Sequence, residues 1–132
     1  MEPTSGSEKP IGIAIIVCDR VITEAGTNNK TIVSTFNNIT TKVLPCVRHR
    51  LSVFVSLTNT RGEKQIELVL KKDERNILKL GGKATFPDPN HVIELIFNFR
   101  NLVFPEQGKY GFEVYADDEY IFERQFNVVV AK

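Results

Sequence analysis

The sequence predicts an all-β protein built as an antiparallel β-sandwich of about eight or nine strands. Several short stretches alternate apolar and polar residues at every second position, which is the period of a strand with one buried face. Segments rich in Gly, Pro, Asn and Asp separate these stretches, as turns between strands do. The composition of nine Phe, no Trp and a single Met, with many Val and Ile, also favours pleated strands over helices.

Length and charge limit the organisation of the chain. At 132 residues and 42% hydrophobic content it can bury one core but is short for two domains. We therefore expect a disordered tail over residues 1–10 and one domain over residues 11–132. The formal net charge is +1, with 17 basic and 16 acidic residues mixed along the chain. This balance predicts neither a nucleic acid nor a membrane surface as partner.

The first apolar run, residues 11–17, is either part of a secretion signal or a strand. The preceding segment carries Glu2 and Glu8 against the single Lys9, whereas a signal needs a basic leader. The run is also far shorter than the ~20 residues that cross a bilayer. These features favour a buried first strand.

The middle of the chain predicts hairpins and strand pairs. Asn and Gly in residues 25–29 predict a turn between the first strand and a return strand over residues 30–39. Residues 40–50 then cross to strands that alternate from Leu51 and from Ile66. Residues 70–78 fit either a short helix or a charged turn, and a short strand is expected at residues 83–86.

The last third of the chain, residues 92–130, carries the most specific pattern. Pro105 and Gly108 mark a turn, and apolar residues then recur at alternate positions from Tyr110. The spacing Glu106-x-Gly108-x-Tyr110-x-Phe112 resembles the tyrosine corner of immunoglobulin-like sandwiches, in which the phenol bonds back to the backbone. The alternative is that Tyr110 is an ordinary half-buried strand residue. Phe112 stands where an antibody domain has its second Cys, so the resemblance implies the sandwich without its disulfide.

Three segments, residues 15–21, 30–39 and 101–110, carry a wider resemblance. Together they resemble a family of small, uncharacterised, immunoglobulin-like proteins of bacteria and their phages, over nearly the whole chain after Pro10. The resemblance implies a fold and no activity, so it assigns no catalytic residue. Where an Asp-Gly hairpin turn is expected, this chain has Asp117-Asp118, which leaves the turn type open.

Cys18 and Cys46 have neither the number nor the spacing of a metal site. They could form one disulfide or remain two free thiols. Because no export signal is recognised, we expect free thiols in a reducing compartment, the cytoplasm.

The remaining motifs favour no catalysis, cofactor or metal. His49 and His91 are too few for a metal site, and Gly81-Gly82-Lys83 lacks the outer Gly and Ser/Thr of a phosphate-binding loop. Residues 48–50, Arg-His-Arg, fit a solvated strand end as well as a phosphate contact. The carboxylates of residues 117–119 are more typical of a solvated hairpin tip than of a calcium site.

We therefore expect a non-enzymatic module that binds a protein partner or takes part in an assembly. Its interaction surface is predicted from outward-facing apolar residues, which either the second sheet or a second copy of the chain could cover, and from an acidic hairpin tip: Phe54, Val69, Ile96, Asp117 and Asp118. The alternative is a small-ligand-binding protein or enzyme with a pocket at one end of the sandwich, near His91 or the acidic tip.

Overall fold

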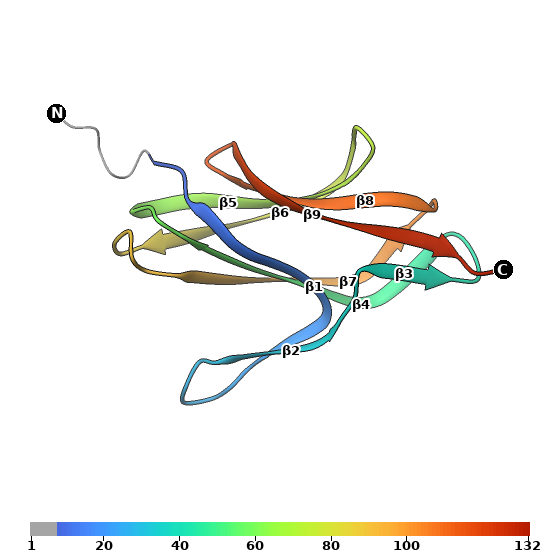
Figure 1. The fold of residues 1–132 in the computed structure, drawn as a ribbon, viewed down its shortest axis with the longest axis horizontal. Helices are drawn as coiled ribbons and strands as arrows, with labels where there is room; N and C mark the ends of the chain where they lie inside the picture. The colour runs from blue at the N-terminus through green and yellow to red at the C-terminus, as the bar shows by residue number, and fades with distance from the viewer. Residues whose placement is uncertain (1–7) are drawn as a thin grey trace.

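The computed structural model describes residues 8–132, and all regular secondary structure in this range is β-strand. The strands form a four-stranded sheet of order β2-β1-β4-β7 and a five-stranded sheet of order β3-β9-β8-β5-β6 (Figure 1). Every pairing is antiparallel except that of β3 with β9. The all-β prediction is confirmed, with these nine strands: β1 (Ile11–Thr23), β2 (Lys30–Thr35), β3 (Asn38–Thr41), β4 (Cys46–Thr58), β5 (Gly62–Lys72), β6 (Arg75–Phe86), β7 (Ile93–Phe104), β8 (Gly108–Ala116) and β9 (Glu119–Val130).

The core lies between the two sheets and takes alternate residues from each. On β4 the inward residues Leu51, Val53, Val55 and Leu57 are fully buried, as are Ile66, Leu68 and Leu70 on β5. Aromatic rings join the layers: Phe112 of β8 lies with its ring centroid 5.6 Å from Phe99 of β7 and 5.4 Å from Phe126 of β9. Phe112 is 0% exposed, so it occupies the interior position that the sequence predicts.

The hydrogen bond predicted for Tyr110 is present. Its hydroxyl donates to the carbonyl oxygen of Glu106 at 2.6 Å and accepts from the Glu106 amide at 3.3 Å. Gly108 has a φ of +133°, and a Cβ there would lie 3.2 Å from the end of the Lys72 side chain. Glycine at this position therefore permits both the turn after Pro105 and the close approach of Lys72.

Beyond Cys18 the hairpin of β1 and β2, which forms the edge of the four-stranded sheet, extends away from β4 and lies beneath it in Figure 1. Residues 11–18 of β1 pair with β4, whereas residues 18–23 pair with β2. The Nζ atom of Lys30, at the start of β2, lies 3.3 Å from Glu94 near the start of β7. The paired residues Val21 and Ile32 lie on the same face of the hairpin as Lys30, and all three are half-buried. Ile22, on the other face of the hairpin, is 43% exposed. The hairpin thus forms a partial third layer.

This third layer corrects the predicted apolar surface. Phe54 points away from the core, between the directly paired Ile16 and Ile96, yet it is only 7% exposed because the hairpin covers this face. Ile96 is half-buried. Val69, on the outer face of the five-stranded sheet, is 5% exposed because its neighbours on β6 and β8, Lys79 and Glu113, have long side chains. Phe54 and Val69 are therefore covered within the chain and do not form an exposed apolar surface.

The two ends of β1 also differ from expectation. Residues 1–7 of the predicted tail lie outside the described residues, but Pro10 is buried and the Thr60 hydroxyl donates to the Glu8 carbonyl oxygen at 2.5 Å. Residues 11–17 form a strand as predicted, although Ile11 and Ile13 are 54% and 53% exposed. A register shift between Gly12 and Ala14 turns Ile13 outward.

The other open alternatives are decided by the backbone. Residues 70–78 hold the turn between β5 and β6, so they form the charged turn and no helix. Residues 83–86 are the end of the longer strand β6. Cys18 and Cys46 are both free and buried, and burial raises the pKa of Cys18, which keeps this thiol protonated at neutral pH.

Replacing Tyr110 with Phe should lower the free energy of unfolding by about 0.5–1.5 kcal/mol, because the partly buried hydrogen bonds between its hydroxyl and the Glu106 backbone are lost. Urea denaturation followed by circular dichroism measures the change. An unchanged midpoint would show that the hydroxyl contributes nothing to stability.

Candidate functional site

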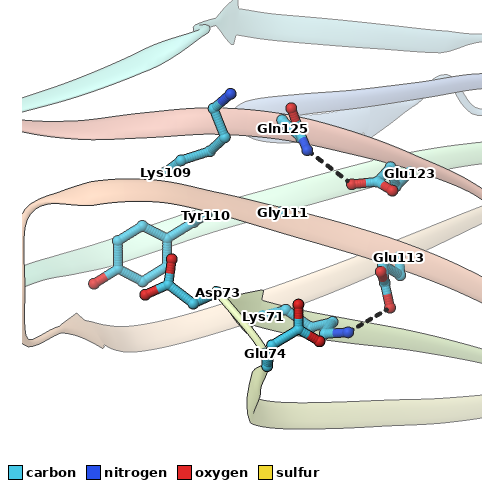
Figure 2. Close-up of a pocket in the computed structure, with 9 residues that line it drawn as sticks. All are labelled: Lys71, Asp73, Glu74, Lys109, Tyr110, Gly111, Glu113, Glu123 and Gln125. Atoms are coloured by element: carbon cyan, nitrogen blue, oxygen red, sulfur yellow. Dashed lines mark hydrogen bonds and ion pairs between the residues drawn. The ribbon is translucent and has the colours of Figure 1, made fainter.

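A hollow of about 210 Å³ lies on the outer face of the five-stranded sheet, over β5, β8 and β9 (Figure 2). The turn between β5 and β6 closes one end of it. We call it the acidic hollow, because four carboxylates and two lysines are among the residues that line it: Lys71, Asp73, Glu74, Lys109, Tyr110, Gly111, Glu113, Glu123 and Gln125.

Strand alternation in β8 builds the floor of the acidic hollow. Phe112 and Val114 point into the core, so Gly111 and Glu113 point outward. Gly111 contributes no side chain there, and a Cβ at this position would lie 3.5 Å from the Glu123 carboxylate. The small residue therefore leaves room in the sheet surface next to Glu123.

Two carboxylates meet across the β8–β9 pair. Glu113 and Glu123 are directly opposite each other in the register, an arrangement in which like charges repel. Hydrogen bonds from tyrosine hydroxyls offset this repulsion. The Tyr115 hydroxyl donates to Glu113 at 2.8 Å, and the Tyr120 hydroxyl donates to Glu123 at 3.0 Å. The pair is thus held together on an open face by neighbouring donors.

Further donors lie at the sides of the acidic hollow, as the dashed lines in Figure 2 show. The Lys71 Nζ atom lies 3.7 Å from the Glu113 carboxylate, and Gln125 donates to Glu123 at 3.2 Å. Lys71 balances one of the two charges. Glu123 accepts hydrogen bonds from the neutral side chains of Tyr120 and Gln125, and within residues 8–132 no cationic side chain lies within ion-pair distance of it.

Both tyrosines remain hydrogen-bond donors at neutral pH. Burial, followed by the hydrogen bond to Glu123, raises the pKa of Tyr120 to about 12. The hydrogen bond to Glu113, followed by burial, raises the pKa of Tyr115. Their rings pack edge to face with centroids 5.9 Å apart, and Tyr120 is 42% exposed. They form an aromatic ledge beside the carboxylates.

An ion-pair network joins the β5–β6 turn to the tyrosine corner. Lys72, whose side chain is 11% exposed, lies 3.2 Å from Asp73 and 3.3 Å from Glu106, and Arg75 lies 3.1 Å from Glu106. The hydrogen bonds to Asp73 and Glu106 raise the pKa of Lys72. The hydrogen bond from Lys72, followed by the charge of Arg75, lowers the pKa of Glu106.

The acidic hairpin tip has a structural explanation. Asp117 and Asp118 both have positive φ, 47° and 69°, as a two-residue type I′ turn requires, and Asp tolerates this conformation better than most residues. The Asp117 carboxylate accepts the Gln65 amide at 2.9 Å, which ties the tip to β5. Asp118 lines a second hollow of about 270 Å³ on the same face, together with Tyr115.

The histidines lie apart. His49 is near the start of β4, where its Nδ1 atom lies 3.1 Å from Asn101, and the His91 carbonyl oxygen accepts from Thr58 at the other end of that strand. Within residues 8–132 no three His, Cys, Asp or Glu side chains are grouped so that they could hold a metal ion. Neither histidine lines the acidic hollow.

A family model described as a family of unknown function, DUF6941, matches residues 13–129. This match spans most of the 132 residues. The chain belongs to the DUF6941 family. No curated protein matches the chain. Membership of DUF6941 therefore assigns no residue a role, and the site rests on the geometry alone.

The part of this DUF6941 chain that the structure describes contains no helix long and apolar enough to span a membrane. Sequence reasoning found the turns around the acidic hollow but missed Glu113, Glu123, Tyr115 and Tyr120. The available signal was that polar residues fill the outward positions of residues 109–115 and 119–125. Alternation shows that these side chains share a face, but only the register places the two glutamates opposite each other.

Replacing Glu106 with Gln should reduce stability at pH 7 by an amount that disappears in acid. The pKa of Glu106 is lowered in the folded protein from an ordinary 4.5, so its ion pairs stabilise the fold above about pH 4.5 and cease to do so as the pH falls through the lower folded value. Urea denaturation of both proteins at pH 7 and pH 3 measures the gap, with Glu63→Gln as a control for loss of one surface carboxylate. An equal gap at both pH values would contradict this assignment.

Proposed function

We propose that this protein is a non-enzymatic binding module that recognises a positively charged segment of a protein partner through the acidic hollow. The observation that carries the proposal is the pair of opposed carboxylates, Glu113 and Glu123, next to the Tyr115–Tyr120 ledge. Carboxylate pairs accept the fork of an Arg or the ammonium of a Lys. Tyrosines beside such groups are typical anchors of protein interfaces.

The volume of the acidic hollow supports a protein partner more than a small ligand. Pockets for drug-sized molecules usually measure roughly 300–1,000 Å³. The acidic hollow, at about 210 Å³, is smaller and suits a single side chain of a partner. The alternative, a small-ligand-binding protein or enzyme with a pocket at one end of the sandwich, has less support because the carboxylates that could act as acid or base already accept hydrogen bonds from tyrosines.

We also infer an immunoglobulin-like sandwich. It is supported by strands β1, β4 and β7 in one sheet and β9, β8 and β5 in the other, and by β3, which pairs in parallel with β9. The Tyr110 hydrogen bond at the start of β8 supports it further, since a tyrosine corner sits at the corresponding strand of that fold. An origin in bacteria or their phages rests on the sequence resemblance.

A cytoplasmic location and a single unidentified protein partner complete the proposal. Two buried cysteines without a disulfide fit a reducing compartment. A second copy of the chain is a less supported partner, because the apolar residues that would drive self-association, Phe54 and Val69, are covered within the chain. Neither nucleic acid nor membrane is needed to explain the acidic hollow.

Site-specific photo-crosslinking in the native cell tests the proposal. A photoreactive residue at Gln125, in the acidic hollow, should capture a defined protein, whereas the same residue at Thr31, exposed on β2, should not. The double variant Glu113→Gln, Glu123→Gln should lose that product, because an uncharged hollow no longer attracts a cation. The proposal fails if both positions give the same products or if capture at Gln125 survives the double substitution.

A further inference from the structure

A second concave surface lies on the four-stranded sheet, on the opposite side of the core from the acidic hollow. It measures about 480 Å³, and we call it the arginine hollow. Strands β1, β4 and β7 supply the residues that line it: Asp19, Val47, Arg48, His49, Arg50 and Arg100. Three arginines and one aspartate line it, so these four side chains together carry two excess positive charges.

Two of these arginines are forced together by the fold. Arg50 of β4 and Arg100 of β7 are directly opposite each other in the strand register, where like charges repel. Asp19 compensates only in part, since it accepts from the Nη2 atom of Arg50 at 2.6 Å. Within residues 8–132, no carboxylate lies within ion-pair distance of Arg100 or Arg48.

The arginine hollow is also partly preorganised. The Arg48 guanidinium lies 4.5 Å from the centre of the Phe36 ring, a cation–π contact that restrains its position. The ion pair with Asp19 restrains Arg50, and the hydrogen bond between His49 and Asn101, at 3.1 Å, restrains the imidazole. Donors held in place by the protein lose less entropy when they bind an anion.

We propose that the arginine hollow binds a compact anion carrying two or more phosphate groups. Guanidinium groups bind phosphate oxygens in a bidentate fork, and two excess charges call for a ligand of at least matching negative charge. The volume falls in the range of small-molecule sites, roughly 300–1,000 Å³. The arginines that line the hollow are confined to positions 48, 50 and 100, which is too small a patch to follow a nucleic acid backbone, so the ligand is small.

Binding should stabilise the fold, because an anion between Arg50 and Arg100 replaces repulsion with attraction and binds only the folded chain. Inorganic pyrophosphate is the probe, with thermal unfolding and isothermal titration as readouts. Arg100→Gln is the test variant and Lys83→Gln, an exposed lysine on β6 of the other sheet, is the control for losing one charge. Pyrophosphate should raise the unfolding temperature of the natural protein and of Lys83→Gln.

Arg100→Gln should bind pyrophosphate at least about tenfold more weakly, and without ligand it should unfold at the same or a higher temperature than the natural protein. Amide shifts in NMR spectra of the natural protein test the site independently of any variant and should concentrate at residues 47–50 and 98–101. The proposal is overturned if those shifts are spread over the surface or if the two variants lose affinity for pyrophosphate equally. It is also overturned if sodium sulfate at matched ionic strength raises the unfolding temperature as much as pyrophosphate does. Tighter binding of a single-stranded oligonucleotide than of pyrophosphate would overturn it too.

Discussion

The inward position of Phe112 is the constraint on which the rest of the structure depends. Its ring lies between Phe126 of β9 and Phe99 of β7, so one side chain fixes β8 against its own sheet and against the opposite one. Because side chains alternate along a strand, this placement directs Gly111 and Glu113 outward. A slip of one residue would bring a carboxylate into the core and a phenylalanine into water, which is why the register is strongly specified.

The outer faces of the two sheets carry different kinds of side chain. The four-stranded sheet has apolar outer residues around Phe54, and the β1–β2 hairpin folds back over them, held at its tip by the Lys30–Glu94 ion pair. Within residues 8–132 no hairpin covers the outer face of the five-stranded sheet, which carries charged and tyrosine side chains. The chain therefore has an acidic hollow on one sheet and an arginine hollow on the other. The formal net charge of +1 gives no sign of either hollow, because the negative charge of one offsets the positive charge of the other.

Local pattern was enough to predict much of this architecture. Alternation predicted the strands, and the Glu106-x-Gly108-x-Tyr110 spacing predicted the Tyr110 hydrogen bond. The two cysteines were expected to be free thiols, and both are free. The sequence did not reveal the features of the structure that depend on pairing between strands far apart in the chain. The cover over Phe54 depends on β1 changing its partner from β4 to β2 at Cys18. The meeting of Arg50 with Arg100 depends on the register of two strands far apart in the chain.

One strand, β8, separates the dry interior from the charged outer face of the five-stranded sheet. Neighbouring substitutions on that strand test it most directly: Phe112→Ala and Glu113→Gln, each compared with the natural protein by the free energy of unfolding in urea. We predict that Phe112→Ala costs about 3–5 kcal/mol, because it leaves a cavity between the sheets. Glu113→Gln should cost about 1 kcal/mol or less, because the glutamine lies on the outer face and can still accept the hydrogen bond from Tyr115. Equal costs for the two variants, or a Phe112→Ala protein as stable as the natural one, would contradict the account.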